Sequence, residues 1–164
     1  MSDQGQAAMP PERQFMLQRI YIKDLSFETP NSPAIFRQEW HPETGLNLNT
    51  QVNQLEASTF EVVLTLTLTA KIEDKTAYLV EIQQAGIFTI LGFPEEEMPM
   101  LLGAYCPATL FPYAREAISD LITKGSFPQM LLQPVNFDAL FFQHQQQMMM
   151  RQAEAGGQDP AAVQ

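Results

Sequence analysis

The chain has 164 residues, a length that fits one domain able to bury about two thirds of its unfolded surface. Its 9 Lys and Arg residues stand against 19 Asp and Glu residues, which gives a formal net charge of −10. This charge disfavours nucleic acid and anionic membrane surfaces as partners and favours a basic partner. The single cysteine, Cys106, excludes an intramolecular disulfide framework and a Cys-rich zinc site, as is typical of a reducing compartment.

The sequence predicts neither a membrane span nor a secretory signal. Its apolar runs are too short and too broken by Gly and Pro to insert into a bilayer, and the N-terminus lacks an apolar segment behind a basic one. We therefore expect a cytoplasmic protein. Residues 1–15 are polar and interrupted by proline, and residues 151–164 are low in hydrophobic side chains, so both ends are expected to be disordered around a domain of residues 16–150.

Residues 18–29 form the first predicted strand, and their apolar positions change parity midway. Ile20 and Ile22 share one face, whereas Leu25 and Phe27 share the other, which indicates a β-bulge or a strand covered on both sides. The TPNSP segment ends this strand. A long loop follows, and its aromatic content predicts that it is tied down on the domain.

Three further strands complete the predicted sheet. Residues 46–53 alternate between apolar and polar side chains, as in a half-solvated strand. From Phe60 to Ile72 every even position is apolar or Ala, which is the clearest strand pattern in the chain. Residues 73–76 read as a turn, and residues 77–93 return as the second arm of an antiparallel hairpin.

Two helices are predicted after the sheet. The first opens at Pro107 or Thr109 with Pro112 inside its first turn, and Gly125 is a signal for its end. Asn136 is a good N-cap for the second helix. One side of that helix carries Phe137, Leu140, Phe141, His144 and Met148. The predicted fold class is α+β, a four-stranded antiparallel sheet with two C-terminal helices.

The stretch from Gly103 to Phe142 contains seven aromatic residues and four prolines. Each aromatic side chain brings roughly 150–250 Å² of area, and the prolines prevent the stretch from folding as one helix. Some of this area is therefore expected to find cover outside a simple single-subunit core. A second subunit or an apolar ligand would supply that cover.

A catalytic site is not predicted. The two histidines, His41 and His144, lack metal-binding spacing, and no nucleophile elbow or phosphate-binding loop occurs. Cys106 precedes a predicted helix and is the one tempting nucleophile, but apolar neighbours favour a packing role. The Glu95–Glu97 run favours a solvated loop. We expect no enzyme, no metal and no cofactor.

Several separated motifs resemble the SecB family of bacterial export chaperones. They are RIYIKDLSFE, VEIQQAGIF, LGAYCP, LFPYARE and PVNFDALF, in the family's order, so the likeness runs from about Arg19 to Phe142. The resemblance implies a homotetramer, built as a dimer of dimers with its first helices between two layers of sheet. It also implies that the protein holds unfolded preproteins and delivers them to the motor ATPase SecA, without enzymatic activity or a cofactor.

The resemblance also implies where the partners bind. It places the acidic docking site for the motor on Asp24, Glu28, Leu79 and Glu81. One departure is Val80, where family members can carry a cysteine, and its effect is expected to be slight because the position stays apolar. A client chain needs long apolar grooves, which we expect to be lined by Phe36, Trp40, Tyr78, Phe137, Phe141 and Phe142.

The subunit interface is predicted from helix stripes and strand parity. We assign to it Tyr105, just before the first helix, and Leu110, Ile118 and Leu121 of that helix, with Ile82 and Gln84 of the last strand.

Three alternatives remain open from the sequence. They are a small-molecule or lipid carrier that uses the aromatic surface as a cavity, a thiol hydrolase built on Cys106, and a SecB-like chaperone for a client outside export, such as an antitoxin.

Overall fold

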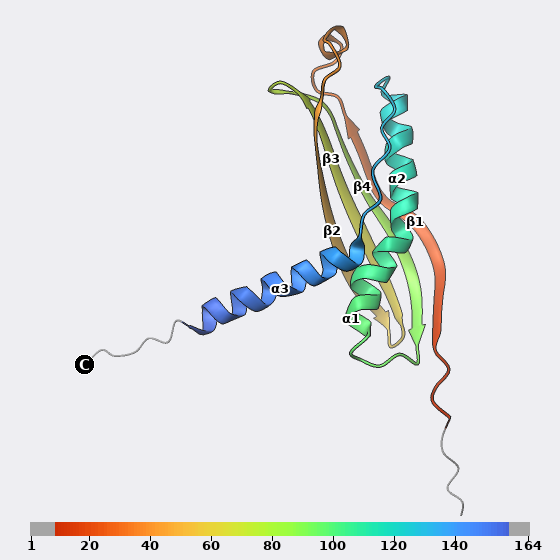
Figure 1. The fold of residues 1–164 in the computed structure, drawn as a ribbon. Coiled ribbons are helices and arrows are strands. Elements are labelled where there is room, and N and C mark those ends of the chain that lie inside the picture. The colour runs from red at the N-terminus through yellow and green to blue at the C-terminus, as the bar shows by residue number, and fades with distance from the viewer. Residues whose placement is uncertain (1–8, 158–164) are drawn as a thin grey trace, which may run out of the picture.

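A computed structural model of the chain describes residues 9–157 as one antiparallel sheet covered on one face by helix (Figure 1). The strands are β1 (Gln14–Glu28), β2 (Glu43–Glu56), β3 (Thr59–Ile72) and β4 (Lys75–Leu91), in the spatial order β1-β4-β3-β2. The 3₁₀ helix η1 (Ala34–Arg37) lies in the β1–β2 loop. After the sheet come α1 (Met98–Met100), the π-helical turn η2 (Leu101–Tyr105), α2 (Cys106–Lys124) and α3 (Phe137–Gly156). The predicted fold class is confirmed.

Alternation of apolar and polar residues sets the two faces of the sheet. In β3 the even positions from Phe60 to Ile72 are buried, and the even positions of β4 from Tyr78 to Ile90 are buried beside them on the face that α2 covers. The predicted β3–β4 hairpin is present, and Glu73 adopts a φ of 54° in its turn. We call the side away from α2 the open face.

Two register shifts explain the change of parity in β1. One shift lies between Leu17 and Arg19 and the other between Ile22 and Asp24, where β1 pairs with β4. Because the second bulge adds one residue, Lys23, between them, Ile20 and Phe27 point to the same covered face despite their different parity. The predicted bulge is thereby confirmed.

The helical segment begins earlier than the sequence indicates. Helical turns start at Met98 and continue through η2 into α2, so Pro112 is an internal position rather than a first-turn one. Proline there leaves the carbonyl of the exposed Ala108 without its usual intrahelical donor. Gly125 ends α2 as predicted, and a Cβ at this position would clash with the Phe27 ring.

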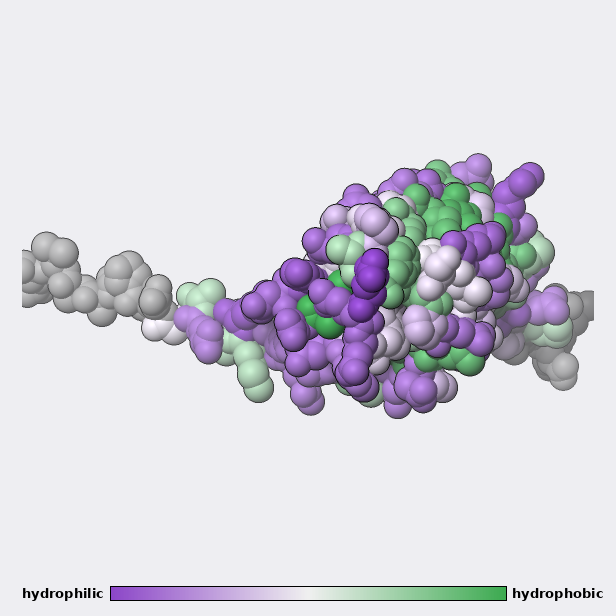
Figure 2. Space-filling view, turned by 90° about the horizontal axis from the view of Figure 1, so that it is seen from above, coloured by the Kyte–Doolittle hydropathy of each residue, from purple (hydrophilic) through white to green (hydrophobic). Residues whose placement is uncertain are grey.

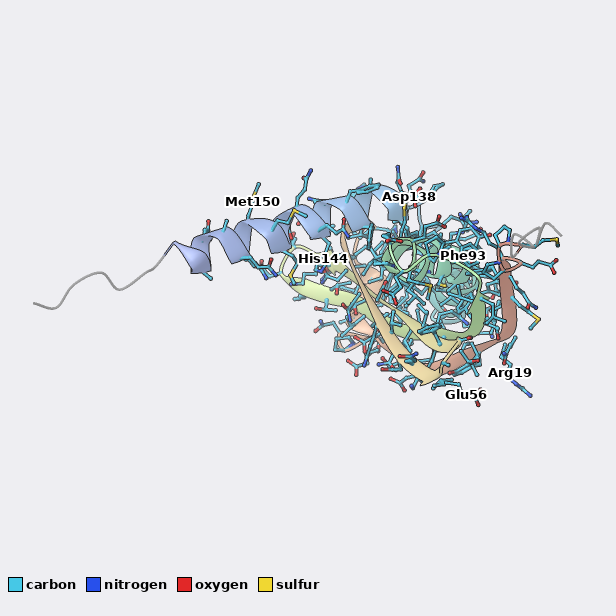
Figure 3. The ribbon with its side chains drawn as sticks, turned by 90° about the horizontal axis from the view of Figure 1, so that it is seen from below. Arg19, Glu56, Phe93, Asp138, His144 and Met150 are labelled. Atoms are coloured by element: carbon cyan, nitrogen blue, oxygen red, sulfur yellow. The ribbon has the colours of Figure 1, made fainter. Side chains whose placement is uncertain are left out.

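Helix α3 packs on the body only near its beginning and then projects outward (Figures 1 and 3). The side chain of Asn136 accepts a hydrogen bond from the backbone N–H of Ala139 at 3.0 Å, which confirms the predicted N-cap. Figure 3 shows Asp138 beside the body and Met150 on the projecting part. The helix runs to Gly156, past residue 151 where the disordered tail was expected to begin. Likewise β1 begins at Gln14, inside the expected N-terminal tail, and residues 1–8 and 158–164 lie outside the described part.

No helix within residues 9–157 combines the length and the apolar character that a bilayer span requires.

Candidate functional site: an acidic open face and a cavity beside β2

The open face brings together the four residues expected at the docking site. β1 and β4 are neighbours in the sheet, and their register sets Asp24 opposite Gln83, Ser26 opposite Glu81 and Glu28 opposite Leu79. Directly opposed residues of antiparallel strands point to the same face, so the three carboxylates and Leu79 form one patch. We call Asp24, Glu28, Leu79 and Glu81 the acidic patch.

Local contacts fix part of this patch. The Thr67 hydroxyl donates a hydrogen bond to the Glu81 carboxylate at 2.9 Å, from the neighbouring strand β3. Asp24 and Glu28 are exposed, whereas Leu79 and Glu81 are half-buried. The patch therefore offers carboxylate oxygens to solvent from two paired strands of the sheet.

A buried carboxylate, Glu61 of β3, lies on the same open face. Tyr21 donates a hydrogen bond to it, Lys23 forms an ion pair with it at 2.9 Å, and the Asn53 side-chain amide donates at 2.8 Å. The hydrogen bonds from Tyr21, Asn53 and Lys23 lower the pKa of Glu61 to about 2. Burial, together with the bond to Glu61, raises the pKa of Tyr21 to about 12.

The aromatic residues of the β1–β2 loop pack on the far end of the covered face. Trp40 lies 5.5 Å from Phe127 and 6.2 Å from Tyr78 between ring centroids, and Phe36 lies 5.0 Å from Phe127. This confirms that the loop is tied down. Phe36 stays 46% exposed, but Tyr78 is only 1% exposed. The assignment of Tyr78 to direct client contact is therefore corrected, because the buried Tyr78 ring packs against Trp40 instead.

A cavity of about 520 Å³ lies between the edge strand β2 and the first half of α3. Leu46 and Leu48 of β2 line one wall, and Phe137, Phe141 and His144 of α3 line the other. Gly103 of η2 closes the end, where a Cβ would lie 2.8 Å from the Phe141 ring.

The aromatic side chains that were predicted to line the client groove differ in how much surface they present near this cavity. Phe137 is only 6% exposed, so it presents little surface to a client. Phe142 lies outside the lining and is exposed, with its ring 5.8 Å from that of Phe141. Seen from the end that holds the β1–β2 loop, apolar surface gathers on the body, whereas α3 is mainly hydrophilic (Figure 2).

Four of the six predicted interface residues belong to the core of a single subunit. They are Ile82, Gln84, Leu110 and Ile118. Side chains with almost no accessible surface have none to give to a second subunit, so this assignment is corrected. Tyr105, at 55% exposure, and the half-buried Leu121 keep surface available, as does Tyr113.

Cys106 lacks the properties of a nucleophile. It is fully buried in the core, and burial raises the pKa of its thiol to about 12, so the thiolate is scarce at neutral pH. Within the described residues, no group of three His, Cys, Asp or Glu side chains is placed to hold a metal ion.

Neither the Glu61 cluster nor the β2 wall of the cavity is predicted by the sequence. Glu61 stands among the outward positions of β3, where a carboxylate usually faces water, and its partners come from other strands. Leu46 and Leu48 were recognised as the apolar side of a strand, but their place opposite α3 depends on the tertiary fold.

Comparison with known proteins points to one family. A family model described as "Preprotein translocase subunit SecB" matches residues 7–148. The chain is 61% identical over 154 residues to the Protein-export protein SecB of Methylococcus capsulatus, covering 94% of this chain and 97% of that protein. It is 57% identical over 148 residues to the protein of the same name from Nitrosococcus oceani, covering 89% and 87%.

A solved structure shares the fold. It is the Mycobacterium tuberculosis Rv1957 SecB-like chaperone in complex with a ChAD peptide from the Rv1956 HigA1 antitoxin. The match has a TM-score of 0.62 and 19% sequence identity, and it covers 74% of this chain and 90% of the solved one.

Proposed function

Because the chain belongs to the SecB family and is a protein-export chaperone of that family, we propose that it holds unfolded preproteins without ATP and delivers them to the SecA motor. The observation that carries this proposal is the separation of two surfaces on one sheet. Apolar surface for a client borders the covered face and the β2–α3 cavity, whereas the acidic patch lies on the open face. A client and a motor can therefore bind at the same time.

Client holding is assigned to aromatic surface that the subunit leaves accessible. Phe36 and Trp40 present it at the β1–β2 loop, and Phe141 and Phe142 present it beside the cavity. An unfolded chain offers scattered apolar side chains, so several separate contact areas suit it better than one shaped pocket. Folded proteins bury these groups and would bind poorly. The proposal includes no catalytic step, and it places the protein in the cytoplasm, where preproteins are met before export.

The working form is proposed to be a homotetramer, a dimer of dimers. Tyr105 at the end of η2 and Tyr113 of α2 stand exposed and would bury their rings against another subunit. One client that touches several subunits gains strength from each later contact, because that contact is intramolecular. Sedimentation should therefore give a tetramer at micromolar concentration, and a stable monomer there would contradict this part of the proposal.

Docking of the motor is assigned to the acidic patch. Three carboxylates and Leu79 on a rigid strand pair attract a basic element at long range, and the attraction is screened by salt. SecA binding should thus weaken as salt rises to the range where the Debye length falls to roughly 8 Å. Client holding depends on apolar contacts and should change less.

The charge reversal Asp24→Lys with Glu81→Lys tests this assignment. Both substitutions leave the apolar surfaces untouched, so we expect the variant to suppress aggregation of an unfolded client as the wild type does. Binding to purified SecA should be lost, because like charges then face each other. A charge-reversed protein that binds SecA with wild-type affinity would overturn the docking assignment, and Glu95–Glu97 would be the next surface to test.

A further inference from the structure

The bulge in β1 brings a cation to the edge of the acidic patch. Tyr21 is opposite Ala85 and Asp24 is opposite Gln83, so the intervening shift places an extra residue, Lys23, between two positions of the open face. Its Nζ atom lies 2.9 Å from Oε1 and 3.2 Å from Oε2 of Glu61. Lys23 is therefore next to Asp24 in the chain while its charge is held on β3.

Glu61 holds this charge with both carboxylate oxygens. Oε2 accepts from Tyr21 and Lys23, and Oε1 accepts from Asn53 and Lys23. Tyr21 and Lys23 come from β1, which β4 separates from β3, and Asn53 comes from β2 on the other side of β3. The cluster therefore links β1 and β2, which do not pair with each other. Ala85, opposite Tyr21 on β4, has only a methyl group, which leaves room for the β1 side chains to cross towards Glu61.

Glu61 and Lys23 carry opposite charges in this cluster at neutral pH. Glu61 is only 9% exposed, and its hydrogen bonds lower the pKa of its carboxyl to about 2, so it is ionised at neutral pH. Lys23 keeps nearly half of its side-chain surface, with 45% exposed. Without Glu61, an exposed ammonium group on a flexible stem would stand beside the acidic patch.

We propose that Glu61 is a specificity-determining residue of the docking face: it confines and neutralises Lys23, so that a basic partner meets the carboxylates of the acidic patch without a competing cation. This inference rests on the proposed function, since it assumes that a basic partner docks on the open face. Glu61 does not touch that partner itself. It acts on binding through the position and the charge of Lys23.

The test measures binding of purified SecA to the full chain at low and at high salt. Glu61→Gln keeps the shape of the side chain but leaves Lys23 uncompensated, so binding should weaken roughly three- to tenfold at low salt, and the difference should shrink at high salt. Glu43→Gln changes the net charge equally at the start of β2, away from Lys23, and should alter binding less than about twofold.

The double variant Glu61→Gln with Lys23→Met distinguishes the proposed role from a structural one. Removing the freed cation should return SecA binding to within about twofold of the wild type, whereas a distorted sheet would not recover. Holding of an unfolded client serves as the fold check and should stay unchanged in all variants.

The outcomes separate this inference from the proposed function. If wild-type protein fails to bind SecA, or if Asp24→Lys with Glu81→Lys binds normally, the docking assignment itself is wrong. If wild-type binding is salt-dependent but Glu61→Gln matches it, Glu61 does not set the charge of the docking face. Weakened binding that Lys23→Met does not rescue would equally overturn the inference, because Glu61 would then act through the fold.

Discussion

The covered face and the open face of the sheet are built from alternate residues of the same strands, yet they hold different chemistry. In β3, Leu64, Leu66 and Leu68 are buried beneath the helical layer, whereas Thr65, Thr67 and Thr69 on the other side stay partly accessible. The three leucines bury their apolar surface only when the helices cover the sheet. The second set can change its charge or hydrogen bonding while the core stays intact. Adjacent residues therefore separate stability from recognition.

The largest expected effect comes from placing the same charge on each face. Leu64→Asp buries a carboxylate without a partner in the core, so it should lower the free energy of unfolding by about 4 kcal/mol or more, or prevent folding. Thr65→Asp, one residue along, should cost about 1 kcal/mol through lower strand propensity. Urea unfolding of both variants makes the comparison, and equal losses would mean that the two faces are not distinct.

A smaller loss is expected where the loop completes the covered face. Trp40→Ala removes ring packing against Tyr78 and Phe127, so it should lower the free energy of unfolding by about 3 kcal/mol and also weaken client binding. Phe142→Ala is the matched control, because that ring is exposed and its loss should cost less than about 0.5 kcal/mol. If Trp40→Ala lost stability but bound clients normally, Trp40 would be a core residue only.

The open face should contribute a specific dependence on pH through Glu61. Its pKa falls from 4.5 to about 2 on folding, so its stabilisation is fully present above about pH 4.5 and is lost as the pH falls towards 2. Glu61→Gln should lower the free energy of unfolding by about 1–3 kcal/mol at pH 6, where a charged acceptor is lost. This difference should narrow at pH 3. A constant difference between pH 6 and pH 3 would contradict the lowered pKa.

The smallest effect on stability is expected at the exposed carboxylates. Glu28→Gln should change the free energy of unfolding by less than about 0.5 kcal/mol, since the side chain is exposed on the open face. Binding to SecA should nevertheless weaken at low salt. Thermal unfolding and a binding assay on one preparation would show whether recognition changes without stability.

The sequence predicts the strands, but it does not predict every feature of the fold. Alternation over Phe60 to Ile72 identifies both faces of β3, and the parity change in β1 identifies the bulge, because both are local consequences of side-chain direction. The start of the helical segment was placed too late, since Pro107 and Thr109 look like a first turn while η2 extends the helix towards Met98. Local signals cannot reveal that a π-helical turn precedes them.

Some functional residues could likewise be identified from the sequence, whereas others are identified only by the tertiary fold. Asp24, Glu28 and Glu81 were assigned by resemblance, and the register of β1 with β4 then places them side by side. The four corrected interface residues show the opposite case, because an apolar stripe demands cover without saying what provides it. The partners of Glu61 come from β1 and β2, far away in sequence, so only the tertiary fold reveals the cluster.

The strand order also leaves the sheet with two unequal edges. Two bulges interrupt the pairing of β1, and bulges near an edge discourage the addition of another strand. β2 keeps a continuous register with β3 from Glu43 to Gln54, and asparagines recur along it at 47, 49 and 53. A strand with regular pairing on one side leaves a regular row of backbone N–H and C=O groups on its other side. A protein of a family that keeps other chains from aggregating thus carries, at β2, the more regular of its own two sheet edges.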